Sequence, residues 1–182
     1  DTEGMLYALL QNGFEITEEL DQADLLIVNT CSFIQSAKEE SIEAILQAGE
    51  IKSQKEGCKL LVTGCLPERY REELARELPE VDAFVGVNQY GKIVDIVNRM
   101  FEGERIAEFV ERAALPLGRV RTTPKHLAYV RIAEGCDHAC AYCAIPSIRG
   151  PYRSRPMESI LAEAQQLAEE GYSELILVAQ DT

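Results

Sequence analysis

The sequence predicts an α/β fold built on a parallel sheet, and two observations support this prediction. Short apolar runs without polar alternation recur along the chain, which is typical of strands that are buried on both faces. Longer segments, in which apolar residues repeat with helical spacing, lie between these runs. Such strand–helix alternation indicates parallel strands that are covered by helices.

We predict a first domain over residues 1–106, with helices on both faces of its sheet. It begins with a short helix, capped by the segment 1–3 and ended by Asn12-Gly13. Three strands and three helices then alternate. The predicted strands are 23–28, 59–63 and 83–85, and the predicted helices are 33–48, 68–78 and 92–101. Pro79 ends the second of these helices, because proline cannot continue a helix.

Glycine and proline residues interrupt the alternation after residue 103, and we predict a linker over 107–126. The second domain, 127–182, follows with a strand at 127–132, a cysteine loop, a helix at 157–170 and a strand at 174–179. This βαβ unit is typical of the beginning of a parallel (βα) barrel. Because the chain lacks an initiator Met and ends directly after a strand, we expect a fragment of a longer protein, truncated at both ends.

The net charge of −13 is concentrated in residues 1–112, which carry 11 basic and 23 acidic side chains. An acidic surface repels phosphate groups, so we do not expect the first domain to bind nucleic acid. The longest apolar runs fall well short of the roughly 18 residues of a membrane helix, and we expect no membrane partner. We expect a cytoplasmic protein whose six cysteines stay reduced and act as metal ligands, catalytic thiols or buried apolar residues.

A cysteine loop at 134–150 reads EGCDHACAYCAIPSIRG and places Cys136, Cys140 and Cys143 in a CxxxCxxC pattern. Three thiolates at this spacing can bind three irons of a cubane iron–sulfur cluster, and the fourth iron then stays open to a substrate. A tetrahedral zinc site that adds His138 is the alternative. His138 lies only two residues from both Cys136 and Cys140, which is tight for joint ligation of one ion.

Two further cysteines, Cys31 and Cys65, each follow a predicted strand directly. The carboxyl ends of parallel strands meet at one edge of a sheet, where the functional loops of such folds lie. We therefore expect these two cysteines to lie close together if their strands are neighbours.

The second domain resembles the radical SAM superfamily. The cysteine loop follows a strand, has an aromatic residue directly before its last cysteine, and opens a βαβ unit. The resemblance implies that Cys136, Cys140 and Cys143 hold a 4Fe–4S cluster, which binds S-adenosylmethionine (SAM) and cleaves it to a 5′-deoxyadenosyl radical. It also implies that Tyr142 packs near the adenine of SAM.

The first domain resembles the N-terminal domain of the methylthiotransferases, through the segments 29–42 (NTCSFIQSAKEESI) and 62–70 (VTGCLPERY). That family holds a second, auxiliary 4Fe–4S cluster through three cysteines, and Cys31 and Cys65 match two of them. The third, in a Gly-Cys-x-x-Asn turn, would lie before Asp1. The resemblance implies sulfurs of Cys31 and Cys65 within roughly 5–8 Å of each other. Cys58 does not match, and we expect it across the strand, away from both.

The resemblance implies a transferase that uses SAM and an electron donor to add a methylthio group to an unactivated carbon. In one branch of the family the target is the β-carbon of an aspartate in small-subunit ribosomal protein S twelve. In the other it is an adenosine of transfer RNA. The apolar pair Phe33-Ile34, the run AKEESI at 37–42 and the final segment 180–182 are closer to the first branch. The sequence therefore favours ribosomal protein S twelve as partner, with transfer RNA as the alternative.

Three basic residues, Arg149, Arg153 and Arg155, follow the cysteine loop. A surface role and contact with SAM or an acidic substrate are both open. The family's later SAM-contacting strands and its substrate-binding domain would lie beyond Thr182, so we expect the isolated fragment to be inactive.

Overall fold

The computed structural model describes residues 1–109 and 118–182 of the chain. These residues form two compact units, Asp1–Val120 and Arg121–Thr182. The boundary between the units falls inside the segment 107–126 that the sequence assigns to a linker. Residues 110–117 of that segment lie outside the described residues, so the extent of the linker stays a prediction. Within the described ranges, no helix is both long and apolar enough to cross a membrane.

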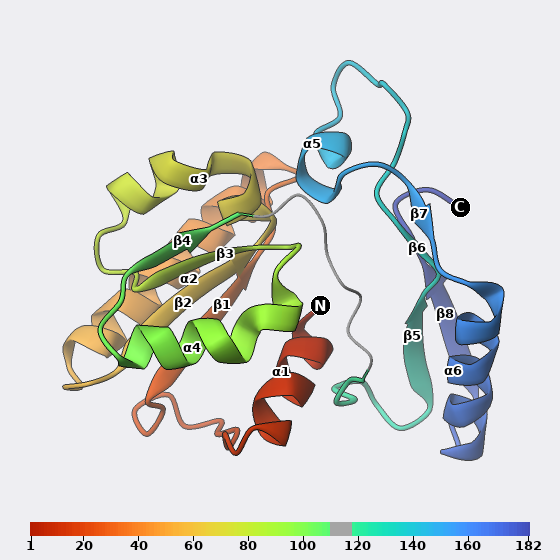
Figure 1. Ribbon diagram of the computed structural model, residues 1–182, viewed down its shortest axis with the longest axis horizontal. Coiled ribbons are helices and arrows are strands. Elements are labelled where there is room, and N and C mark those ends of the chain that lie inside the picture. The colour runs from red at the N-terminus through yellow and green to blue at the C-terminus, as the bar shows by residue number, and fades with distance from the viewer. Residues whose placement is uncertain (110–117) are drawn as a thin grey trace. The chain divides into compact units, whose positions relative to one another are not determined.

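The first unit contains a four-stranded parallel sheet in the order β1-β2-β3-β4 (Figure 1). Each strand therefore lies beside the next strand along the chain. The strands are β1 (Leu25–Thr30), β2 (Lys59–Gly64), β3 (Ala83–Gly86) and β4 (Ile106–Glu108). The helices are α1 (Thr2–Gln11), α2 (Gln35–Ser53), α3 (Cys65–Glu77) and α4 (Ile93–Phe101), with a short 3-10 helix η1 (Tyr90–Lys92) before α4.

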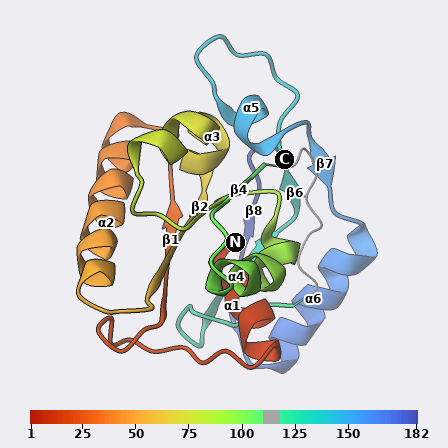
Figure 2. The same cartoon turned by 60° about the vertical axis from the view of Figure 1, so that its left-hand side comes forward.

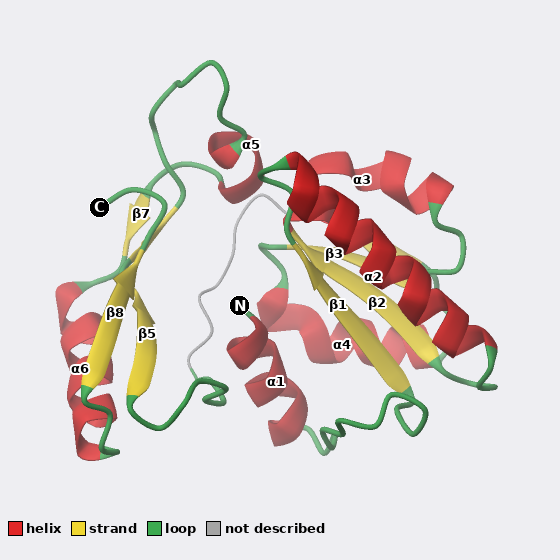
Figure 3. Cartoon of the chain, turned by 180° about the vertical axis from the view of Figure 1, so that it is seen from behind, coloured by secondary structure: helices red, strands yellow, loops and turns green. Residues whose placement is uncertain are grey.

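Helices α2 and α3 cover one face of this sheet, and α1 and α4 cover the other (Figure 2, Figure 3). Side chains alternate in direction along a strand, so Leu60 and Val62 of β2 face α2 and α3 while Leu61 faces α1 and α4. All three are fully buried, and the first two share a core with Ile45 and Phe84. Burial on both faces explains why the sequence of β2 shows no polar alternation.

The strand β4 is the part of the sheet that the sequence does not predict. It pairs in parallel with β3, with Ala83 opposite Ile106, and the Ile106 side chain is buried. Three residues that follow Arg105 and end in a glutamate give no recognisable apolar run, which explains the miss. The strand occupies residues 107 and 108, which the sequence assigns to the linker. β1 also differs slightly, because it begins and ends two residues later than predicted.

Helix α3 begins three residues earlier than predicted, directly at Cys65. Gly64 permits this sharp turn, because its φ of 102° lies in a region that other residues avoid and a Cβ would meet the backbone of Thr30. The helix is kinked at Arg71, whose φ of 40° and ψ of −117° are not helical. It ends before Leu78, because the residue that precedes a proline avoids the α region.

The second unit is a βαβ unit with a long loop after its first strand. β5 (Leu127–Arg131) and β8 (Glu174–Val178) pair in parallel, and α6 (Met157–Glu169) connects them, as the sequence predicts. The loop contains α5 (Ile145–Arg149) and two short strands, β6 (Ala133–Glu134) and β7 (Arg153–Ser154), which pair antiparallel. The sequence does not reveal these strands, because a two-residue strand has no periodicity. Ala128, Val130 and Leu167 form the buried core of this unit.

Candidate functional site

Cys31 and Cys65 follow neighbouring strands, as expected. β1 and β2 are paired so that Thr30 lies opposite Gly64. Cys31 directly follows Thr30, and Cys65 directly follows Gly64. Both cysteines therefore lie at the carboxyl edge of the sheet. Cys31 is exposed and Cys65 is buried. A small cavity of about 180 Å³ lies beside Cys31, between β1 and α2. The separation of the two sulfurs stays a prediction.

Serine hydroxyls hold the backbone of both cysteine positions. Ser41 Oγ accepts from the Cys31 N–H at 3.1 Å and donates to the Cys31 carbonyl at 3.0 Å. Ser32 Oγ donates to the Cys65 carbonyl at 2.9 Å, so the loop after β1 is bonded directly to the start of α3. Both serines are buried. Sequence reasoning missed these contacts, because a serine in a loop or helix gives no signal until its neighbours in space are known.

Cys58 lies at the opposite end of β2. It directly precedes Lys59, which pairs with Leu25 at the start of β1. A strand of this length spans roughly 17 Å, at about 3.3 Å per residue. The Cys58 side chain is buried, its sulfur lies 3.5 Å from the Ala23 carbonyl oxygen, and burial raises the pKa of its thiol. The prediction that Cys58 lies away from the cysteine edge is confirmed.

Cys136, Cys140 and Cys143 lie in the loop between β6 and α5. None of the three is in a disulfide; Cys136 is buried, Cys143 is half-buried and Cys140 is exposed. The Cys143 N–H donates to the Cys140 carbonyl at 3.0 Å, which turns the chain between them. The His138 N–H donates to the Cys136 sulfur at 3.5 Å. Hydrogen bonds of this kind to sulfur are a feature of protein-bound iron–sulfur clusters, and three free thiols are a fitting donor set for one.

The base of the cysteine loop is anchored by a buried carboxylate. Glu134 Oε1 accepts from Arg149 Nη1 at 2.8 Å and lies 3.3 Å from Arg131 Nη1. The next residue, Gly135, donates its N–H to Gln180 Oε1 at 2.8 Å. A side chain at position 135 would collide with the backbone of Pro151, so glycine is required there. These contacts fix the position of Cys136 at the start of the loop.

Among the described residues, one group of side chains lies close enough together to bind a single metal ion. Cys136, His138 and Asp181 place their ligand atoms within 4.8 Å of one another. His138 Nε2 lies 3.4 Å from Asp181 Oδ2, which in turn lies 3.9 Å from the Cys136 sulfur. The zinc site considered from the sequence joined His138 to all three cysteines, and this group contains only one of them. The thiolates of a cubane cluster bind separate irons, so they need not lie as close as the ligands of one ion.

The remaining candidates from the sequence have different surroundings. Tyr142 is 92% exposed, so its side chain is accessible beside Cys143. Arg149 is engaged by Glu134, and Arg155 donates to Glu163 Oε2 at 2.6 Å. These ion pairs favour a structural role for Arg149 and Arg155. Arg153 lies half-buried on β7.

Comparison with known proteins covers both units. Residues 1–86 match the family model described as uncharacterized protein family UPF0004, and residues 130–182 match that of the radical SAM superfamily. Over its whole length, the chain is 49% identical to the ribosomal protein uS12 methylthiotransferase RimO of Desulforamulus reducens. It is 48% identical to the RimO protein of Trichlorobacter lovleyi and 46% identical to that of Caldicellulosiruptor saccharolyticus. Over its whole length, the chain is therefore similar to the RimO-type methylthiotransferases.

The chain spans about two fifths of the length of those relatives, covering 42%, 41% and 42% of them respectively. Its fold is also similar to that of TsrM from Kitasatospora setae, a radical SAM methyltransferase whose structure has cobalamin and a 4Fe–4S cluster bound. The TM-score is 0.66 at 13% identity, over 97% of this chain and 44% of TsrM. At this identity the similarity concerns the fold alone.

Proposed function

We propose that the protein to which this chain belongs is a radical SAM methylthiotransferase that modifies the β-carbon of an aspartate in ribosomal protein S twelve. One observation carries the proposal. The CxxxCxxC loop opens a parallel βαβ unit in a chain that is 46–49% identical, over its full length, to RimO proteins. The loop supplies the radical chemistry, and the relatives supply the substrate class.

The cysteines divide between two proposed cluster sites. Cys136, Cys140 and Cys143 would hold the 4Fe–4S cluster to which SAM binds, and the exposed Tyr142 would pack against the adenine. Cys31 and Cys65 would hold an auxiliary 4Fe–4S cluster together with one further cysteine. When bound, the clusters and SAM supply the hydrogen-abstracting radical and the sulfur for transfer. The chain's own residues support the backbone at these cysteines, through Ser32 and Ser41 in one site and Glu134 in the other.

The partners follow from this chemistry. Cleavage of SAM requires one electron, so the proposal includes an external electron donor. A protein that modifies a ribosomal protein works where ribosomes are made, and we place it in the cytoplasm. Transfer RNA is the alternative substrate, and the names of the relatives do not favour it. We expect the 182-residue chain alone to lack activity, because it offers two cysteines for the auxiliary cluster.

A metal-loading experiment tests the cofactor assignment. Anaerobic reconstitution of the chain with iron and sulfide should give about four irons at the Cys136 loop and a brown thiolate–iron absorption. Replacing Cys136, Cys140 or Cys143 by Ala should remove this iron, whereas Cys58→Ala should retain it. Stoichiometric zinc, lost from both Cys136→Ala and His138→Ala but kept in Cys140→Ala, would instead support an ion at the Cys136, His138 and Asp181 group.

A substrate assay tests the activity. The full-length protein, given SAM, a reductant and a sulfur source, should add a methylthio group to ribosomal protein S twelve, and mass spectrometry of the tryptic peptides would locate it. Transfer RNA under the same conditions should stay unmodified. Methylthioadenosine in transfer RNA, with an unchanged ribosomal protein, would assign the protein to the other branch of the family.

A further inference from the structure

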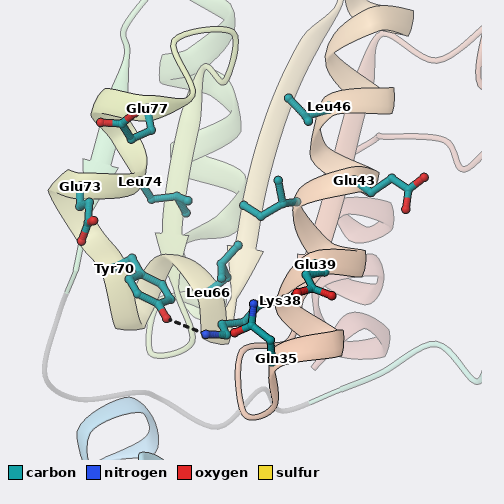
Figure 4. Close-up of a pocket in the computed structure, with 11 residues that line it drawn as sticks. Gln35, Lys38, Glu39, Glu43, Leu46, Leu66, Tyr70, Glu73, Leu74 and Glu77 are labelled. Atoms are coloured by element: carbon teal, nitrogen blue, oxygen red, sulfur yellow. Dashed lines mark hydrogen bonds between the residues drawn. The ribbon is translucent and has the colours of Figure 1, made fainter.

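A groove lies between helices α2 and α3 on one face of the first unit's sheet (Figure 4). Its volume of about 550 Å³ is in the range of sites that enclose a ligand or several side chains. Ile42 of α2 and Leu66 and Leu74 of α3 line it with apolar surface. At its far end, Leu46 is 48% exposed. A partner that covered this surface would gain from the burial of apolar area.

The rims of the groove are acidic. Each helix contributes two exposed glutamates, Glu39 and Glu43 from α2 and Glu73 and Glu77 from α3. Lys38 is the one basic residue among the described residues that line the groove, and it donates to the Tyr70 hydroxyl at 3.4 Å. The lining therefore has an apolar centre and a net charge of about −3 at neutral pH.

One end of the groove lies at the cysteine edge of the sheet. Helix α2 begins at Gln35, four residues after Cys31, and α3 begins at Cys65. Both helices then run away from that edge, so their early residues line the near end of the groove and Leu46 and Glu77 line the far end (Figure 4). A segment bound along the groove would therefore point towards the proposed auxiliary cluster.

We propose that the α2–α3 groove binds a basic, partly apolar segment of the protein substrate, an inference that rests on the proposed function. Carboxylates on both rims attract lysine and arginine side chains, and the apolar centre accepts an aliphatic side chain between them. Proteins that bind ribosomal RNA are rich in such basic residues, because they must neutralise phosphates. The same rims repel nucleic acid and acidic proteins. The groove thus recognises the substrate apart from the reacting aspartate.

Charge reversal on both rims tests this proposal in the full-length protein. The variant Glu43→Lys with Glu73→Lys changes one residue on each helix, and the control Glu15→Lys with Glu18→Lys makes the same charge change in the exposed loop before β1. Binding of purified ribosomal protein S twelve is measured by calorimetry, and methylthiolation by steady-state kinetics. The rim variant should raise both Kd and KM at least tenfold and leave kcat unchanged. The control should change Kd and KM by less than twofold.

The outcomes separate the groove from the reaction. Unchanged Kd and KM in the rim variant, or equal weakening in the control, would overturn the groove while leaving the proposed function intact. A protein that binds ribosomal protein S twelve but does not modify it would overturn the function, and the Kd comparison would still decide the groove. If no binding occurs at all, both proposals are wrong. If circular dichroism shows that the double rim variant is unfolded, the variant Leu46→Ala, which leaves the charge unchanged, takes its place.

Discussion

Its position in the fold and the raised pKa of its thiol set Cys58 apart from the proposed cluster ligands. Thiolates are the metal ligands and nucleophiles, so a cysteine that stays protonated at neutral pH is a poor candidate for either role. Cys58 is buried, and that burial raises the pKa of its thiol. Of the proposed cluster ligands, Cys31 and Cys140 are exposed, whereas Cys65 and Cys136 are buried.

Alkylation measures this difference directly. In the metal-free chain at pH 7.5, iodoacetamide should label Cys31 and Cys140 at least tenfold faster than Cys58, because only the thiolate reacts. Folding raises the pKa of the Cys58 thiol above its value in the unfolded chain, which is about 8.5. The protonated thiol therefore contributes to the free energy of unfolding below that pH, and this contribution is lost as the pH rises through the folded-state pKa. Peptide mass spectrometry gives the three rates. Early labelling of Cys58 would contradict its burial.

The carboxylate of Glu134 makes a second prediction at the residue scale. It pairs with two arginines at the base of the cysteine loop, and its side chain is 5% exposed. Removing one partner of such a buried group costs on the order of 3 kcal/mol. The variant Glu134→Ala should therefore release iron to a chelator several-fold faster than the unchanged chain. The exposed Glu158→Ala serves as control, and equal release rates in the two variants would show that Glu134 does not support the loop.

Helix α3 shows how a single backbone position affects an element. Arg71 has a positive φ inside the helix, which costs a residue other than glycine on the order of 1–3 kcal/mol. Its guanidinium also pairs with the buried Glu68 at 3.1 Å. The strain and the ion pair act in opposite directions, so a single substitution cannot separate them.

Two substitutions at position 71 do separate them. Arg71→Ala removes the ion pair and keeps the strain, whereas Arg71→Gly removes both. The glycine variant should be more stable than the alanine variant by about 1–2 kcal/mol in urea unfolding. At Arg76, in the regular part of α3, the order should reverse, with glycine about 1 kcal/mol less stable than alanine. The same order at both positions would show that the kink at Arg71 carries no strain.

The sequence predicts most elements of this fold because their signals are local. The apolar runs of β1, β2 and β3 and the turn after α6 are readable residue by residue, and the cysteine spacing is readable in the same way. β4, β6 and β7 are too short for any period, and they exist only because a partner strand is already in place. The contacts of Ser41 with Cys31 and of Glu134 with Arg149 join residues 10 and 15 positions apart, which no local pattern reveals.

At the scale of the whole molecule, the charge is the property that bears on function. The chain has 31 acidic and 18 basic side chains. Local ion pairs such as Lys52–Asp82, at 2.6 Å, use some of these charges, but residues 1–112 carry 23 acidic side chains against 11 basic ones. This charge balance supports the proposed basic protein partner over transfer RNA.

The same charge predicts how salt affects stability. The many acidic groups repel one another across the surface, and this repulsion is weaker in the unfolded chain, where the charges are farther apart. The Debye length falls from about 30 Å at 0.01 M salt to about 8 Å at 0.15 M, so added salt screens this long-range repulsion while close ion pairs are affected less. At fixed iron content, raising NaCl from 0.01 to 0.15 M should therefore increase the Tm by a few degrees. Removing acidic charge from the exposed segment before β1, with Glu18→Gln and Glu19→Gln, should reduce this increase. A Tm that falls with salt would mean that attractive pairs outweigh the repulsion.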